Sequence, residues 1–156
     1  MQNVRLYEMP DCKMVSSGVG IFGDEKFLKF DEWFQKQKPG LYPKDFMYWE
    51  GSGLVWLYMY EEGMEVPEGL EIVDFKGGFY VVTTDSDVEP DKGAREVEIA
   101  KFMVEHGLEP DGERPELASV VSSPLVELIL KYNQMDYFTP VKVKQSDEED
   151  SEEIDG

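Results

Sequence analysis

Residues 54–60 carry apolar side chains on both faces of a predicted β-strand. Strict alternation separates the aromatic residues from the aliphatic ones (Trp56, Tyr58 and Tyr60 against Val55, Leu57 and Met59). A strand with one solvated face alternates apolar with charged positions instead. This segment is therefore predicted to be covered on both sides, and its aromatic face covers either ordinary core or a bound molecule.

Periodicity predicts the remaining elements. Strands are expected at 3–10, 13–22, 69–75, 79–85, 116–123 and 135–143, and helices within 23–40 and 90–107, with a short helical piece at 124–133. Asp24 suits a helix N-cap, and Pro39–Gly40 is expected to end that helix. The second helix is expected to pack through Val97, Ala100 and Val104, on a side widened by Ile99, Phe102 and Met103.

The order strand, helix, strand, strand occurs twice in this reading. It predicts an α+β domain over residues 1–144, made of two βαββ units whose helices pack on an antiparallel sheet. Two such units side by side are expected to leave a groove between them, and grooves at such junctions are frequent ligand sites.

Charge limits the function. The net charge of the 156 residues is −19, and residues 145–156 hold seven acids and no base. Direct nucleic-acid binding is not expected, because it depends on Lys and Arg neutralising phosphates. We expect the tail 145–156 to be solvated and disordered, with docking to a basic partner as the alternative.

No apolar run is long enough to cross a membrane, no secretory signal is apparent, and Cys12 alone cannot form an internal disulfide, so a cytoplasmic location is expected.

Motifs for catalysis or metal binding are weak. The one histidine, His106, falls in the last turn of a predicted helix, where a cation favours the helix dipole. The acids of 85–96 match an EF-hand loop at positions one, three, five and twelve, but Pro90 stands where the sharp turn needs glycine. No metal and no cofactor are therefore expected.

Asp136 is the single carboxylate within the final predicted strand, between Met135 and Tyr137. A carboxylate among aromatic residues can pair with a cationic ligand. It can equally accept hydrogen bonds at an irregular or edge strand, which Pro140 favours. Both interpretations remain open at this point.

Four stretches together resemble the GyrI-like small-molecule-binding domain, the effector-binding module of AraC- and MerR-type transcription regulators. They lie at 42–60, at 74–85 with its Gly-Gly-Phe-Tyr, at 102–117 with its Arg-Pro, and at 133–143 with its Asp-Tyr-Phe-Thr-Pro. The resemblance implies two βαββ units around an aromatic-lined groove that binds amphipathic, often cationic, compounds. It places Tyr80, Asp136 and Phe138 at the family's site positions.

Two departures from the family pattern stand out. Many members carry a cation-facing Glu in the strand after Arg-Pro, where this sequence has Ala118, with Glu116 two residues earlier. Regulators of this family also carry a helix-turn-helix domain, for which this chain has no room, so a stand-alone module is expected.

The expected function is binding of hydrophobic, aromatic or cationic small molecules, for sensing or sequestration. The ligand-binding residues are expected to be Tyr48, Trp49, Trp56, Tyr58, Tyr80, Asp136 and Phe138. A hydrolase of electrophilic aromatic compounds, using Asp136 or Glu116 with Tyr80 as donor, is the first alternative. An acidic module that binds a basic protein is the second, and a homodimer remains open.

Overall fold

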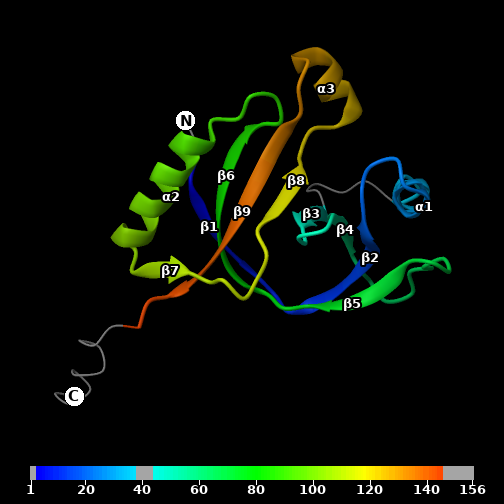
Figure 1. The fold of residues 1–156 in the computed structure, drawn as a ribbon, viewed down its shortest axis with the longest axis horizontal. Helices are drawn as coiled ribbons and strands as arrows, with labels where there is room; N and C mark the ends of the chain where they lie inside the picture. Colours follow the sequence, from blue (N-terminus) through cyan, green and yellow to red (C-terminus); the bar gives the residue numbers. More distant parts are fainter. Residues whose placement is uncertain (1–2, 38–43, 146–156) are drawn as a thin grey trace.

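The computed structural model describes residues 3–37 and 44–145. Within them the chain forms nine strands and three helices: β1 (Arg5–Met9), β2 (Cys12–Gly20), α1 (Glu25–Phe34), β3 (Asp45–Trp49), β4 (Leu54–Met59), β5 (Glu71–Phe75), β6 (Gly78–Ser86), α2 (Lys92–Glu105), β7 (Leu108–Pro110), β8 (Leu117–Val120), α3 (Pro124–Leu130) and β9 (Gln134–Val143) (Figure 1). Apart from Gln145, the acidic tail lies outside the described residues, as does the expected helix end at Pro39–Gly40.

All strands belong to one antiparallel sheet, in the order β1-β6-β9-β8-β3-β4-β2-β5, with β7 added alongside β9. β2, β3, β4 and β5 form one half of the sheet, and β1, β6, β7, β8 and β9 form the other. The edge strand of each half comes, in the sequence, directly before the first strand of the other half. β1 precedes β2 in sequence but pairs with β6, and β5 precedes β6 but pairs with β2.

Because of this exchange, the connection between β1 and β2 crosses the connection between β5 and β6 at close range. The backbone N–H of Gly77 donates to the Asp11 carboxylate at 2.8 Å. A Cβ atom at Gly77 would overlap the Met9 carbonyl oxygen, so only glycine fits at the crossing. The first glycine of the Gly-Gly pair is therefore needed for the topology of the chain.

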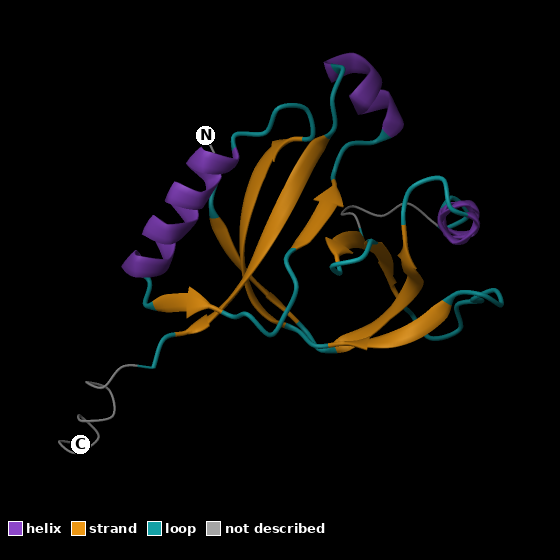
Figure 2. Cartoon of the chain, in the orientation of Figure 1, coloured by secondary structure: helices purple, strands orange, loops and turns teal. Residues whose placement is uncertain are grey.

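The sheet carries its two longer helices on one face, called the outer face here. Figures 1 and 2 show α1 and α2 on opposite sides of the molecule, with strands between them. α1 packs on Val15, Trp56 and Tyr58, whereas α2 packs on Val81 and Val141 through Ile99 and its neighbours. None of the helices that the structure describes lies on the opposite face, called the inner face.

The predicted architecture is confirmed, with differences in detail. β3 was missed, because it is short and follows a stretch punctuated by Pro and Gly. The packing side predicted for α2 was wrong in part: Val97 is 66% exposed and Val104 83% exposed, whereas Ile99 is buried and Phe102 and Met103 pack beside it, as predicted. Asp24 is the N-cap residue of α1, but its carboxylate accepts a hydrogen bond from the Ile21 N–H and none from the helix.

No helix among the described residues is both long enough and apolar enough to cross a membrane.

Candidate functional site

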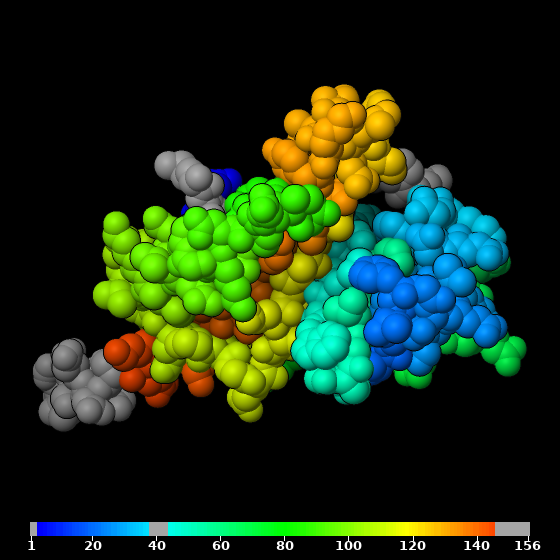
Figure 3. Space-filling view, turned by 45° about the horizontal axis from the view of Figure 1, so that its top comes forward, coloured from blue at the N-terminus to red at the C-terminus, as the bar shows by residue number. Residues whose placement is uncertain are grey.

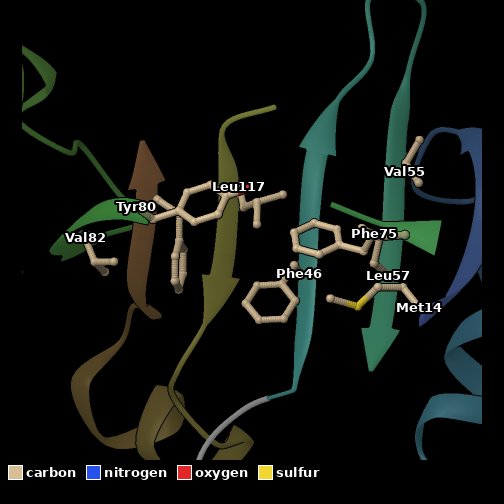
Figure 4. Close-up of a cluster of buried hydrophobic side chains, with 9 residues drawn as sticks. Met14, Phe46, Val55, Leu57, Phe75, Tyr80, Val82 and Leu117 are labelled. Carbon is tan, nitrogen blue, oxygen red and sulfur yellow. The ribbon is translucent and has the colours of Figure 1, made fainter. Parts of the chain in front are cut away.

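The inner face carries the largest apolar layer of the molecule, and both halves contribute to it. Its residues are Met14, Phe46, Val55, Leu57, Phe75, Tyr80, Val82, Leu117 and Phe138. Figure 4 shows Tyr80 and Leu117 on one side of this layer and Phe46 and Phe75 on the other. The rings of Phe46 and Phe138 meet edge to face at 5.5 Å between centroids, which joins the two halves through one aromatic contact.

The space between the halves is filled. None of the nine side chains is more than 7% exposed, although neither α1, α2 nor α3 covers this face. The sheet must therefore curl until its two inner surfaces meet. The expected open groove is corrected accordingly: at these residues the structure has a packed seam.

Two open hollows lie elsewhere, and Trp33 lines both of them. One has a volume of about 570 Å³ and is lined by Lys29, Glu32, Trp33, Lys36, Glu65, Val66 and Pro67. The other, of about 460 Å³, lies between α1 and the turn after β4 and is bordered by Lys44, Glu61 and Glu62. Charged side chains make up four of the seven residues that line the first hollow and five of the ten that line the second. Sites for small apolar ligands are lined mainly by apolar side chains instead.

The structure divides the expected ligand-binding residues between the two faces. Strand register places Tyr48, Tyr80, Asp136 and Phe138 on the inner face. It places Trp49, Trp56 and Tyr58 on the outer face. The grouping of Trp56 and Tyr58 with Tyr80 and Phe138 around one groove is therefore corrected. In β4 it is Leu57 that joins the layer of Tyr80 and Phe138, and its neighbours Trp56 and Tyr58 point to the opposite side of the sheet.

Trp56 and Tyr58 form the core beneath α1. The Trp56 ring lies 4.7 Å from Phe30 between centroids, and Tyr58 meets Trp33 edge to face at 5.5 Å. The Trp56 indole N–H donates to the Asp45 carboxylate at 3.0 Å. Burial raises the pKa of Asp45 above its ordinary value, and this hydrogen bond partly opposes the rise. Trp49, by contrast, is 62% exposed at the end of β3.

Asp136 already has protein partners on the inner face. The Arg5 guanidinium donates to its carboxylate at 3.0 Å, and the Thr84 hydroxyl donates to the other oxygen at 2.8 Å. Arg5 also lies over the Tyr7 ring, at 5.3 Å from the centroid. This ion pair is half-buried. A cationic ligand at Asp136 would have to compete with Arg5.

Tyr80 and Arg114 connect the Gly-Gly and Arg-Pro motifs. The Arg114 guanidinium stacks over the Tyr80 ring at 4.7 Å and donates to the carbonyl oxygens of Phe79 and Val141 at 2.9 and 2.7 Å. A Cβ at Gly78 would lie 2.6 Å from the guanidinium carbon, so the second glycine makes room for Arg114.

This arrangement leaves two buried polar groups without a hydrogen bond, the Tyr80 hydroxyl and Nη1 of Arg114. Tyr80 is completely buried, and burial raises the pKa of its hydroxyl. The charge and the proximity of the Arg114 guanidinium oppose this rise, although the two groups do not meet hydrogen-bond geometry. Nε of Arg114 pairs with Asp111 at 2.9 Å, which holds the pKa of Asp111 below its usual range. Both free groups are donors on or beside the inner layer.

The strand after Arg-Pro carries no carboxylate on the inner face. Register places Ala118 opposite Met47 and Tyr137, hence on the outer face, so the inner positions are Leu117 and Ser119. Ser119 is buried and donates to the Asp45 carbonyl oxygen at 2.9 Å. Glu116 is exposed and precedes β8. The cation-facing Glu that the resemblance implies has no counterpart here.

The acids of the calcium-like run serve local structure. The Asp85 carboxylate accepts hydrogen bonds from the backbone of Ser86 and Asp91, and Asp87 accepts two from Asn133. Residues 3–37 and 44–145 contain no group of three or more His, Cys, Asp or Glu side chains placed to hold a metal ion.

Sequence reasoning missed Arg5, Asp45 and Arg114. Arg5 and Asp136 are 131 positions apart, so no local pattern reveals their pairing. Asp45 begins a strand that was itself missed. Arg114 did carry a signal, because it is the Arg of the Arg-Pro motif, but the motif was used only for resemblance.

Comparison with protein families and with curated proteins finds no match to this sequence. Solved structures do match in fold. The C-terminal domain of EcmrR is 12% identical, with a TM-score of 0.58, and the similarity covers 92% of this chain and 99% of that one. EcmrR in complex with DNA gives a TM-score of 0.60 at 11% identity; the match covers 90% of this chain but only 57% of EcmrR in that complex.

A protein from Listeria innocua described as a hydrolase gives a TM-score of 0.62 at 13% identity, covering 90% of this chain and 92% of that one. Identities this low establish a shared fold. The chain therefore has the α+β fold of GyrI-like effector-binding domains, as the sequence resemblance implied.

Proposed function

We propose that this protein is a binding domain for apolar, aromatic small molecules, which it takes up on the inner face when the packed seam between its two half-sheets opens. The Tyr80 hydroxyl is the observation that most supports this. It is fully buried within a layer built by both halves, and it has no hydrogen-bond partner. A buried polar group without a partner costs about 1–3 kcal/mol, which a ligand oxygen at this position would offset.

The seam between the halves offers a route of entry. β6 and β9 pair from Phe79 to Ser86, but the two halves share a single register pair, Met47 with Ala118. The Ser119–Asp45 hydrogen bond is a further link across it. Separating β3 from β8 therefore breaks few hydrogen bonds. The ring of Tyr7, 43% exposed and in edge contact with Phe138, lies at the border of the inner layer.

The free polar groups define the preferred ligand. Asp136 is neutralised by Arg5, whereas Tyr80 and Arg114 each have an unused donor. An aromatic molecule with an acceptor oxygen, such as a ketone or a carboxylate, satisfies these donors. At Asp136, a cation would have to displace Arg5.

We propose binding without catalysis. A hydrolytic base needs a free carboxylate within reach of a bound water. The expected candidates do not offer one, since Asp136 is ion-paired with Arg5 and Glu116 is exposed.

Calorimetric titration with three matched naphthalenes tests the proposal: naphthalene, 2-acetylnaphthalene and 2-naphthylmethylammonium. We expect the acetyl compound to bind most tightly and to be recovered unchanged. Tyr80→Phe should weaken its binding about fivefold to tenfold, the equivalent of one buried hydrogen bond, and leave naphthalene binding unaltered. Tyr132→Phe, which removes a phenol outside the inner layer, serves as control. Failure of all three compounds to bind would overturn the proposed function.

A further inference from the structure

We propose that α3 and the adjoining β6–α2 loop form a docking surface for a partner protein that presents an apolar face bordered by lysine or arginine. This surface is separate from the inner face. It consists of five exposed apolar residues, Val88, Leu125, Leu128, Ile129 and Tyr132, and is called the α3 surface below.

The helix exposes the side that a globular protein normally buries. Leu125, Leu128 and Ile129 are 65, 63 and 68% exposed, and their spacing of three and four residues places them on one side of α3. No residue of α3 is buried. Figures 1 and 3 show the helix projecting from the end of β8 and β9, away from the rest of the fold.

The projecting helix is nevertheless anchored at both ends. At its start, the Ser123 hydroxyl accepts from the Val126 N–H, and Ser122 accepts from the Gln134 N–H. At its end, the Asp87 carboxylate accepts from both the backbone and the side-chain amide of Asn133, at 2.8 and 3.1 Å. A helix of seven residues has little stability of its own. These anchors fix α3 in the free protein, so little conformational entropy is lost when a partner binds its apolar side.

Charge around the α3 surface selects the partner. Residues 85–91 and 122–133 together carry five carboxylates (Asp85, Asp87, Glu89, Asp91 and Glu127) and one base, Lys131. A second copy of the chain would bring the same acids against each other, and an anionic lipid surface would also be repelled. A partner with an apolar face and a basic border complements both the apolar residues of the α3 surface and the acidic residues around them.

The test uses two synthetic amphipathic helical peptides with the same leucine face, one bordered by lysine and the other by glutamate. Labelled peptide is titrated with the full chain and followed by fluorescence anisotropy. The variant Leu128→Asp/Ile129→Asp alters the α3 surface, and Val97→Asp/Val104→Asp makes the same change on the exposed side of α2. Circular dichroism and melting temperature establish that both variants fold.

We expect the lysine-bordered peptide to bind the wild type and the α2 variant equally, and the α3 variant at least tenfold more weakly. Binding should weaken with added salt, and the glutamate-bordered peptide should bind at least tenfold less tightly. The proposal is overturned if the lysine-bordered peptide does not bind, if the α3 variant binds it normally, or if the two peptides bind alike. Light scattering that shows a dimer lost in the α3 variant would overturn it in favour of a second copy.

Discussion

Replacing Gly78 by alanine tests how the Gly-Gly and Arg-Pro motifs act together. Gly78 has φ +146°, a conformation that residues with a Cβ rarely adopt, and its added Cβ would lie 2.6 Å from both Cζ and Nη1 of Arg114. The guanidinium cannot move aside freely, because it donates to two backbone carbonyl oxygens and to Asp111.

The expected cost has two parts. Backbone strain of this kind amounts to about 1–3 kcal/mol. Displacing the Arg114 guanidinium weakens charged hydrogen bonds that contribute about 1.5–3 kcal/mol each. Gly78→Ala is therefore expected to lower the free energy of unfolding by about 3–5 kcal/mol. Gly112→Ala is the control, since Gly112 has neither a positive φ nor an atom within 4 Å of the added Cβ, and it should change stability by less than about 0.5 kcal/mol.

A double-mutant cycle separates the two parts. Arg114→Ala removes the obstacle that Gly78→Ala meets, so the double variant should lose at least about 1 kcal/mol less than the sum of the single variants. Urea unfolding followed by tryptophan fluorescence gives the measurement, because Trp33 and Trp56 are each 7% exposed and report on loss of the core. Strict additivity, or a Gly78→Ala variant as stable as Gly112→Ala, would refute the reasoning.

Three further predictions follow from the buried and paired groups. Asp45→Asn should raise the melting temperature at pH 7, and the advantage of the variant should shrink as the pH falls toward 4. Burial raises the folded-state pKa of Asp45, so the charged carboxylate destabilises the wild type only as the pH rises above the ordinary pKa of 3.8. A difference in melting temperature that does not change with pH would contradict this. Trp56→Ala should lower the unfolding free energy by about 3–5 kcal/mol in urea titrations, whereas Trp49→Ala, at an exposed site, should change it by less than about 0.5; equal effects would refute the placement of Trp56 in the core. Arg5→Gln should free Asp136 and strengthen calorimetric binding of 2-naphthylmethylammonium severalfold; unchanged affinity would show that Asp136 does not face the ligand.

Much of the fold could be predicted from the sequence. Apolar periodicity located most strands and all three helices, because it follows from the geometry of each element and needs no knowledge of its neighbours. The order of elements then indicated two βαββ units. β3 escaped because five residues after a Pro- and Gly-punctuated stretch contain too few alternations to recognise.

Only the tertiary structure decided which aromatic residues share a face. Alternation shows that Trp56 and Leu57 point to opposite sides, but not which side lies under α1 and which meets the other half. That choice depends on register between strands far apart in the chain and on the curl of the whole sheet.

The charged groups follow the same division. Net charge could be read from the sequence and argues against nucleic acid as a ligand, because it is a sum that needs no positions. The partner of Asp136 could not be read, since Arg5 reaches it only after β1 pairs with β6 and β6 with β9. The role of an individual carboxylate depends on the groups within a few ångströms of it. In this chain, the exchange of edge strands between the two halves decides which groups those are.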